Sequence, residues 1–163
     1  MMEKTLLIIW HSRTGGAMRM ARAAEVGATG EVEIILKPAA DATPTDLITA
    51  DGYIFAACEN LASMSGVMKD FFDRCYYPVL GQIEGRPYAT MICAGSDGEG
   101  AARQIARIAL GWRLKPVAEP LIICTNAQTP EAILAPKIIA ETDLAKCREL
   151  GATLAAGLAM GIF

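Results

Sequence analysis

The chain has 163 residues, of which 53% are hydrophobic and 20% are charged, and its formal net charge is −3. This length predicts one domain over residues 1–163, and the composition is too apolar and too weakly charged for a disordered chain. A small negative net charge gives little attraction for a polyanion, so we expect neither nucleic acid nor an anionic membrane surface as a partner.

The ends of the chain and its cysteines indicate the compartment. No apolar run approaches the roughly 20 residues of a membrane-spanning helix. Glu3 and Lys4 precede the first apolar run, and His11-Ser12-Arg13 after it is unlike a cleavage site of small residues, so we expect no signal peptide. The five cysteines are widely spaced and odd in number, which predicts reduced thiols in a cytoplasmic protein. One histidine and no C-x-x-C pair leave no motif for a metal site.

The first part of the chain predicts two strands and a helix. Residues 5–10 form a short apolar run with two isoleucines, which is typical of a buried strand. Residues 17–26 are rich in Ala, Met and Arg and contain no helix breaker, and we expect Gly27 to cap that helix at its C-terminal end. A second strand is predicted at 31–36, where the charged start favours an edge position.

The middle of the chain predicts a brief helix after Thr43-Pro44, a third strand at 53–57 and a long amphipathic helix. In that helix, apolar residues recur at i, i+3, i+4, i+7, i+8 and i+11, a spacing that gives a helix one buried face. The residues of this stripe are Met64, Val67, Met68, Phe71, Phe72 and Cys75.

The last part repeats the alternation. A fourth strand is predicted at 88–94, a glycine-rich turn at 95–100 opens a helix that extends to Trp112, and a fifth strand follows at 121–125. The connection over 126–141 is long for a compact domain and precedes the final helix.

Five strands that alternate with helices predict an α/β fold with a mainly parallel sheet and helices on both faces. The pattern alone allows the strand orders 2-1-3-4-5 and 3-2-1-4-5. In either order, ligands bind beyond the carboxyl ends of the strands, at the point where the order reverses.

The loop after the first strand, residues 11–17, is the first candidate binding site. It contains the hydroxyls of Ser12 and Thr14, two glycines and a helix start, whose free N–H groups favour an anion such as phosphate. An ordinary helix cap by Ser12 or Thr14 is the alternative. The loop matches neither G-x-x-x-x-G-K-[ST] nor G-x-G-x-x-G, which argues against a nucleoside triphosphatase and a Rossmann dehydrogenase.

Two further loops follow the third and fourth strands. The loop at 58–66 leads into the amphipathic helix, and the loop at 94–100 has enough glycine for a flat ligand to lie against its backbone. Within it, residues 94–98 match A-x-S-x-G, a variant of the hydrolase nucleophile elbow with Ser96 as the nucleophile. That interpretation needs a histidine base after the serine, whereas the single histidine, His11, precedes it.

With these three loops, the chain resembles the flavodoxin-like FMN-binding family, and within it the branch of NAD(P)H-dependent quinone and FMN reductases. Residues 12–17 (SRTGGA) are similar to the phosphate loop S/T-x-T-G-x-T, and residues 60–74 (NLASMSGVMKDFFDR) are similar to the run F-G-x-M-S-G-x-M-K-x-F-x-D-R. Gly85-Arg86-Pro87 stands where the family has G-K-P. The resemblance covers almost the whole chain.

The resemblance implies a three-layer sandwich with a five-stranded parallel sheet in the order 2-1-3-4-5 and FMN beside the ends of strands one and three. The first loop would bind the FMN phosphate, the second would lie beside the redox nitrogen of the flavin, and the third would lie against its pyrimidine end. The cofactor-binding residues implied in this way are Ser12, Arg13, Thr14, Gly15, Gly16, Ala17, Glu59, Asn60, Leu61, Ala62, Ser63, Met64, Ala94, Gly95, Ser96, Asp97 and Gly98.

Several positions depart from the family pattern. Ala17 replaces a threonine, so backbone N–H groups would replace one hydroxyl contact to the phosphate. Ala62 replaces a glycine that allows a peptide flip in electron-carrying flavodoxins, and alanine disfavours the positive φ of such a flip. Leu61 replaces an aromatic residue, which would leave more room for a substrate at the ring. Arg13 would pair with the FMN phosphate or with the 2′-phosphate of NADPH, or would simply be solvated.

The resemblance therefore implies an FMN-dependent oxidoreductase that takes hydride from NADH or NADPH and reduces a quinone or a similar small-molecule acceptor, with the flavin supplying the chemistry. A flavodoxin-type electron carrier that serves a partner reductase is the main alternative, and a domain that has lost its flavin is a third. The sequence leaves open the nucleotide, the acceptor, a homo-oligomer, the role of 126–141 and the redox activity of Cys58.

Overall fold

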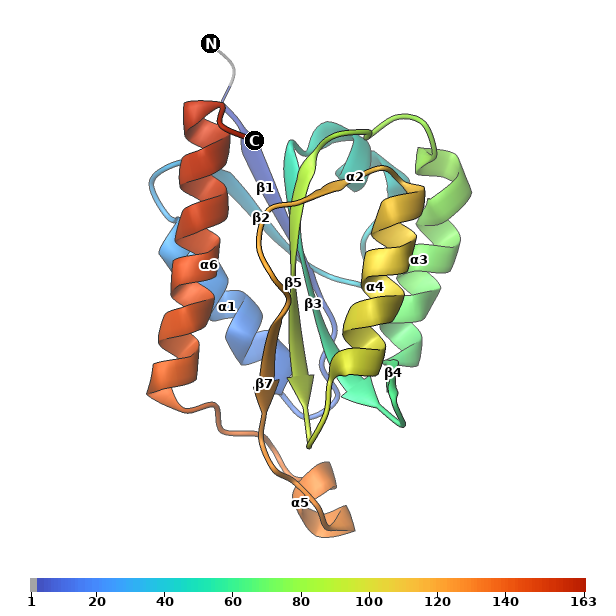
Figure 1. The fold of residues 1–163 in the computed structure, drawn as a ribbon, viewed down its shortest axis with the longest axis vertical. Coiled ribbons are helices and arrows are strands. Elements are labelled where there is room, and N and C mark those ends of the chain that lie inside the picture. The colour runs from blue at the N-terminus through green and yellow to red at the C-terminus, as the bar shows by residue number, and fades with distance from the viewer. Residues whose placement is uncertain (1–2) are drawn as a thin grey trace.

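The computed structural model describes residues 3–163 and has one sheet between two layers of helices (Figure 1). The strands are β1 (Thr5–Trp10), β2 (Glu33–Pro38), β3 (Gly52–Asn60), β4 (Ser63–Met64), β5 (Pro87–Ala94), β6 (Lys115–Pro116) and β7 (Leu121–Cys124). The main strands are parallel in the order β2-β1-β3-β5, and β6 and β7 both pair with the far edge of β5. Since β5 and β7 are the predicted fourth and fifth strands, the order 2-1-3-4-5 is confirmed and 3-2-1-4-5 is excluded.

The helices cover both faces of this sheet (Figure 1). Helices α1 (Gly16–Ala28) and α6 (Glu141–Met160) lie on one face, and α2 (Pro44–Thr49), α3 (Gly66–Val79) and α4 (Glu99–Gly111) lie on the other. The short helix α5 (Pro130–Leu134) lies outside both layers, beyond the carboxyl end of β7. Within residues 3–163, no helix is both long enough and apolar enough to cross a membrane.

Strand β1 illustrates why the central strands are continuous apolar runs. Alternate side chains of a strand point to opposite faces. Leu7 and Ile9 pack into the core on the side of α3 and α4, whereas Leu6 and Ile8 pack into the core on the side of α1 and α6, and all four are fully buried. Because helices cover both faces, these four positions inside the strand favour apolar residues.

Gly27 lies inside α1 and does not cap it, contrary to the prediction. The chain turns instead at Gly30, whose φ is +96°. A Cβ at Gly27 would overlap the carbonyl oxygen of Arg148 on α6, and a Cβ at Gly151 would overlap the carbonyl oxygen of Ala24 on α1. The two glycines therefore allow α1 and α6 to cross at close approach, and this long-range contact decides the role of Gly27.

Several element boundaries also differ from the predictions. The second strand begins at Glu33 rather than at residue 31, although its edge position is confirmed. Met64 belongs to β4, and α3 begins later, at Gly66. Val67, in the first turn of α3, is exposed, whereas the rest of the stripe is buried as predicted. Met64 fits the helical spacing of the stripe, but it lies in β4 and pairs with Glu59 of β3.

Candidate functional site

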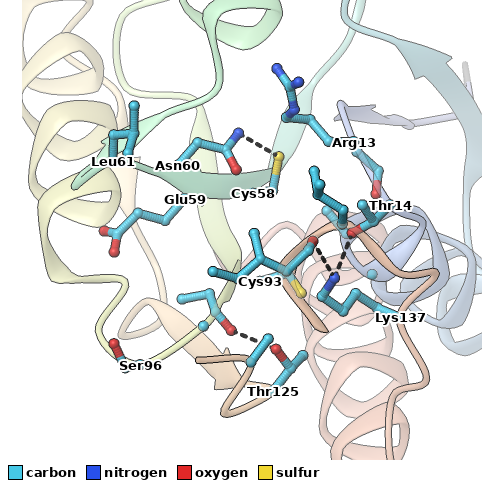
Figure 2. A pocket seen from close by; sticks show the side chains of 18 of the residues that line it. Arg13, Thr14, Cys58, Glu59, Asn60, Leu61, Cys93, Ser96, Thr125 and Lys137 are labelled. Carbon is cyan, nitrogen blue, oxygen red and sulfur yellow. Dashed lines mark hydrogen bonds between the residues drawn. The ribbon is translucent and has the colours of Figure 1, made fainter. Parts of the chain in front are cut away.

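A pocket with a volume of about 550 Å³ opens at the carboxyl ends of the central strands (Figure 2). Pockets of this size take ligands as large as a drug molecule or a cofactor. The predicted cofactor-binding residues that line it are Ser12, Arg13, Thr14, Gly16, Ala17, Glu59, Asn60, Leu61, Ala62, Ala94, Gly95 and Ser96. The other lining residues are Cys58, Cys93, Thr125, Ala127, Gln128, Ile133, Leu134 and Lys137. The fold thus brings the three predicted loops together around one cavity.

The first loop (residues 11–17) presents N–H groups at the start of α1. Ser12 Oγ accepts the N–H of Gly15 at 2.8 Å, and Gly15 has a φ of +95°, which glycine adopts without strain. No side chain caps α1, and the first helical bond runs from the Arg19 N–H to the Gly15 carbonyl. The N–H groups of residues 16–18 consequently have no acceptor within residues 3–163 and favour an anion, which overturns the alternative of an ordinary cap.

Two cysteines lie side by side on the pocket floor. Cys58 on β3 and Cys93 on β5 are register partners in the sheet, and a Cβ at Gly16 would overlap Cys93 Sγ. Burial raises the pKa of the Cys93 thiol to about 11, so this thiol stays protonated near neutral pH and acts in packing. Cys58 Sγ lies 3.5 Å from Nδ2 of Asn60, a weak hydrogen bond that orients the amide at the pocket wall (Figure 2).

The second loop is a β-hairpin rather than the irregular loop that the sequence suggests. Strand β3 continues to Asn60 and pairs antiparallel with β4, and Leu61 and Ala62 form the two-residue turn. Both turn residues have positive φ, +51° and +63° respectively, as in a type I′ turn. The expectation that alanine avoids a positive φ at position 62 is therefore wrong. A non-glycine residue costs about 1–2 kcal/mol in this conformation, so contacts elsewhere must hold the turn.

Glu59 holds one strand of the hairpin to α4. Its carboxylate accepts the N–H of Gly98 at 2.8 Å and the N–H of Ala101 at 3.0 Å. Gly98 is the N-cap residue of α4 and offers no side chain, so Glu59 caps this helix from another strand. Glu59 lines the pocket as predicted, but its two oxygens are engaged by the backbone of α4.

The other strand of the hairpin also contacts α4. The side-chain oxygen of Gln104 accepts the N–H of Met64 at 2.9 Å and the hydroxyl of Ser63 at 3.2 Å. A Cβ at Gly100 would overlap the Ala62 carbonyl oxygen, so the turn rests directly on the helix backbone. These contacts hold the turn in its left-handed conformation.

Five predicted residues do not line the pocket: Gly15, Ser63, Met64, Asp97 and Gly98. Met64 is buried in the core, and Gly98, with a φ of +92°, forms the turn into α4. Asp97 Oδ1 accepts the N–H of Glu99 at 3.2 Å, which places its carboxylate at the helix start. Proximity in sequence to a lining residue does not make these side chains face the cavity.

The connection after β7, whose role the sequence leaves open, supplies a wall of the pocket outside the three predicted loops. The Gly95 carbonyl accepts the N–H of Asn126 at 2.8 Å, and α5 then places Ile133 and Leu134 in the lining. Lys137, which follows α5, reaches back to the first loop (Figure 2). The sequence marks this segment only by its length, since the contact between Lys137 and Thr14 joins residues 123 positions apart.

His11 is not hydrogen-bonded to Ser96 and so is not placed as its general base. Its Nδ1 lies 2.7 Å from Oγ of Ser65, a buried residue at the start of α3. Burial, and secondly the charge of Arg13, lower the pKa of His11 below its usual value. Because His11 is the single histidine of the chain and is paired elsewhere, the geometry gives no support to the hydrolase interpretation.

Comparison with known proteins adds a family match. Residues 19–128 match the family described as NADPH-dependent FMN reductase. The chain is also similar to a flavodoxin from Aquifex aeolicus (strain VF5), with 28% identity over 165 residues that cover 95% of this chain and 87% of that protein.

Solved structures share the fold at low sequence identity. A flavodoxin from the domain Archaea has a TM-score of 0.76 and 18% identity, and the match covers 94% of this chain and 98% of that chain. A flavodoxin, WrbA-like protein from Agrobacterium tumefaciens has a TM-score of 0.69 and 19% identity over 97% and 98% of the two chains. Rubredoxin oxygen:oxidoreductase from Desulfovibrio gigas has a TM-score of 0.77 and 13% identity over 97% of this chain and 37% of that chain. The architecture is therefore flavodoxin-like.

Proposed function

The chain belongs to the NADPH-dependent FMN reductase family, and from that premise we propose that it takes hydride from NADH or NADPH and reduces a quinone or a similar small-molecule acceptor. Bound FMN would supply the redox chemistry, whereas the chain binds and orients it and controls access to it. We further propose a cytoplasmic location, which the five free cysteines support.

The first loop fits the phosphate group of FMN. The N–H groups of residues 16–18 have no partner in the described part of the chain, and their positions at the start of α1 suit a dianion. The Thr14 hydroxyl lines the same end of the pocket. Ser12 acts indirectly, because its hydroxyl holds the Gly15 N–H and so fixes the shape of the loop.

The opposite end of the pocket fits a flat ring system. The hairpin turn at Leu61 and Ala62 lies on one side, and the third loop at 94–96 lies on another. Backbone groups dominate both walls because their side chains are mostly small. The hydrogen bonds between Glu59 and α4 hold these two walls at a fixed separation.

The observation that carries the proposal is the exposed hairpin turn. Leu61 is fully exposed at the rim, and no aromatic side chain lines the pocket in the described structure. An FMN ring bound here would keep one face free of an aromatic cover. Hydride transfer needs a nicotinamide or a quinone ring stacked on such a face, so this geometry favours an enzyme that acts on small planar substrates.

A flavodoxin-type electron carrier remains the second candidate, because the Aquifex aeolicus relative is a flavodoxin. The resemblance implies that a carrier needs a mobile peptide where Ala62 lies. Here Gly100 packs under the Ala62 carbonyl and Gln104 holds the next strand, so the turn has little freedom to flip. The fixed turn supports the enzyme over the carrier.

Anaerobic mixing of the FMN-loaded protein with NADH or NADPH tests the proposal. We expect one nucleotide to bleach the visible flavin absorbance without a partner reductase, and benzoquinone to restore it. A protein that binds FMN but is bleached by neither nucleotide would be a carrier. A protein that binds no FMN would contradict both candidates.

A further inference from the structure

We propose that Lys137, in the segment after β7, supplies a positive charge that helps to neutralise the phosphate of the bound ligand. This inference rests on the proposed function, because it concerns the phosphate end of the same pocket. It assigns a binding role to a residue outside all three predicted loops.

The side chain of Lys137 reaches Thr14 in the first loop (Figure 2). Its Nζ donates to Thr14 Oγ1 at 3.1 Å, and its backbone N–H donates to the Thr14 carbonyl at 2.8 Å. Its Cβ would lie 3.4 Å from a Cβ built at Gly16, so the stem of the side chain packs over the start of α1. Both the backbone and the ammonium group of Lys137 are thus fixed at the anion end of the pocket.

The hydrogen bond to Thr14 also settles the direction of the hydroxyl proton. An ammonium group is a donor only, so Thr14 Oγ1 must be the acceptor in this pair. The Thr14 O–H then needs an acceptor of its own, and none is present within residues 3–163. The hydroxyl is therefore left as a free donor in the pocket lining, and a phosphate oxygen would satisfy it.

The charge of Lys137 has no counterion in the described part of the chain. Its other partners are the carbonyl oxygens of Ala132, Ile133 and Ala135, at 2.9, 2.7 and 2.7 Å. An ammonium group has three N–H donors, so these four acceptors already engage all of them. The neutral carbonyls and hydroxyl leave the net charge of Lys137 uncancelled, and Lys137 would act on a phosphate through this charge. The carboxylate in the lining, Glu59, is bonded to the backbone of α4. The ammonium group of Lys137 therefore lies near the free N–H groups of residues 16–18 before a dianion binds.

The comparison of FMN with riboflavin, which lacks the phosphate, measures this role. We expect Lys137→Met to weaken FMN binding about 10- to 100-fold, because it removes a positive charge from beside the phosphate dianion. Riboflavin affinity should change less than about twofold, and the salt dependence of FMN binding should become shallower. Lys137→Arg should keep most of the FMN affinity.

Lys115→Met is the matched control, since Lys115 is an exposed lysine on β6, at the end of the sheet away from the pocket. It should leave both affinities unchanged. Equal losses of FMN and riboflavin affinity in Lys137→Met would mean that Lys137 only holds α5 in place. An unchanged FMN affinity would mean that Lys137 has no role in binding the phosphate. Either result overturns the inference.

Inorganic phosphate separates this inference from the proposed function. Titration of the flavin-free protein with phosphate, followed through the amide signals of Gly16 and Ala17, should show shifts that Lys137→Met weakens. Failure of the wild-type protein to bind FMN would contradict the proposed function alone. Equal phosphate shifts in the wild type and in Lys137→Met would contradict the role of Lys137 alone.

Discussion

The carboxylate of Glu59 caps α4 at Gly98, although the two residues belong to different loops of the pocket. One oxygen accepts the Gly98 N–H and the other accepts the Ala101 N–H. A single side chain thereby joins the hairpin to the third loop and supplies the cap that Gly98, which has no side chain, does not offer.

Glu59→Gln should lower the free energy of unfolding by about 1–3 kcal/mol. An amide has one oxygen, so its NH₂ group would face one of the two backbone N–H donors. Urea unfolding measures the loss. Glu99→Gln, which alters an exposed acidic residue in the first turn of the same helix, should change stability by less than about 0.5 kcal/mol. Equal effects of the two variants would contradict the capping role of Glu59.

Ala62→Gly should stabilise the protein by up to about 1 kcal/mol, since glycine adopts a positive φ without the steric cost of a Cβ. Ala127→Gly is the control, because Ala127 lies in the same pocket without a positive φ and should gain nothing. Thermal unfolding compares the two variants. A destabilised Ala62→Gly would mean that the turn is not strained.

Gly151→Ala should destabilise the protein by about 1–3 kcal/mol through overpacking. The added methyl group would overlap the Ala24 carbonyl, a backbone atom that cannot rotate away. Gly66→Ala, at the open start of α3, has no atom within 4 Å of the added group and should be neutral or stabilising. Denaturant midpoints report both changes, and similar midpoints would contradict the close crossing of α1 and α6.

The pKa of His11 predicts a loss of stability on mild acidification. Burial, and secondly the charge of Arg13, lower the pKa of His11 in the folded protein, so the folded ring binds a proton at a lower pH than the unfolded chain, which does so near pH 6.5. The stabilising contribution is therefore complete above about pH 6.5 and falls as the pH drops through the lowered folded value. His11→Gln should flatten the decrease between about pH 7 and pH 5, a range above the titration of ordinary carboxylates. A ring-proton titration by NMR that gives the usual histidine pKa would contradict this prediction.

Gly15→Asp should abolish FMN binding as measured by calorimetry. The new carboxylate would stand beside the N–H groups of residues 16–18 and repel a phosphate dianion. Gly30→Asp is a close control, because Gly30 has a similar φ of +96° and no atom within 4 Å of an added Cβ, but lies at the other end of α1. FMN affinity that Gly15→Asp leaves unchanged would contradict the assignment of the first loop.

The amino-acid sequence by itself predicted the five main strands and the first loop, whereas the order of the strands came from the resemblance to the family. Strand β1 was predicted at its observed bounds because burial on both faces requires an uninterrupted apolar run. The turn at Gly15 and the free N–H groups at the start of α1 were predictable from Ser12 to Ala17, because glycine conformation and helix starts are local properties.

Only the tertiary structure decided how the pocket is closed. The turn at Leu61 and Ala62 lacks the Asn-Gly pair that marks a hairpin, and its left-handed conformation depends on Gly100 and Gln104 in α4. Lys137 reaches Thr14 across 123 positions of the chain. Periodicity and capping depend on neighbours along the chain. The left-handed turn at Leu61 and Ala62 and the position of Lys137 depend instead on residues that become neighbours only when the sheet and its helices are assembled.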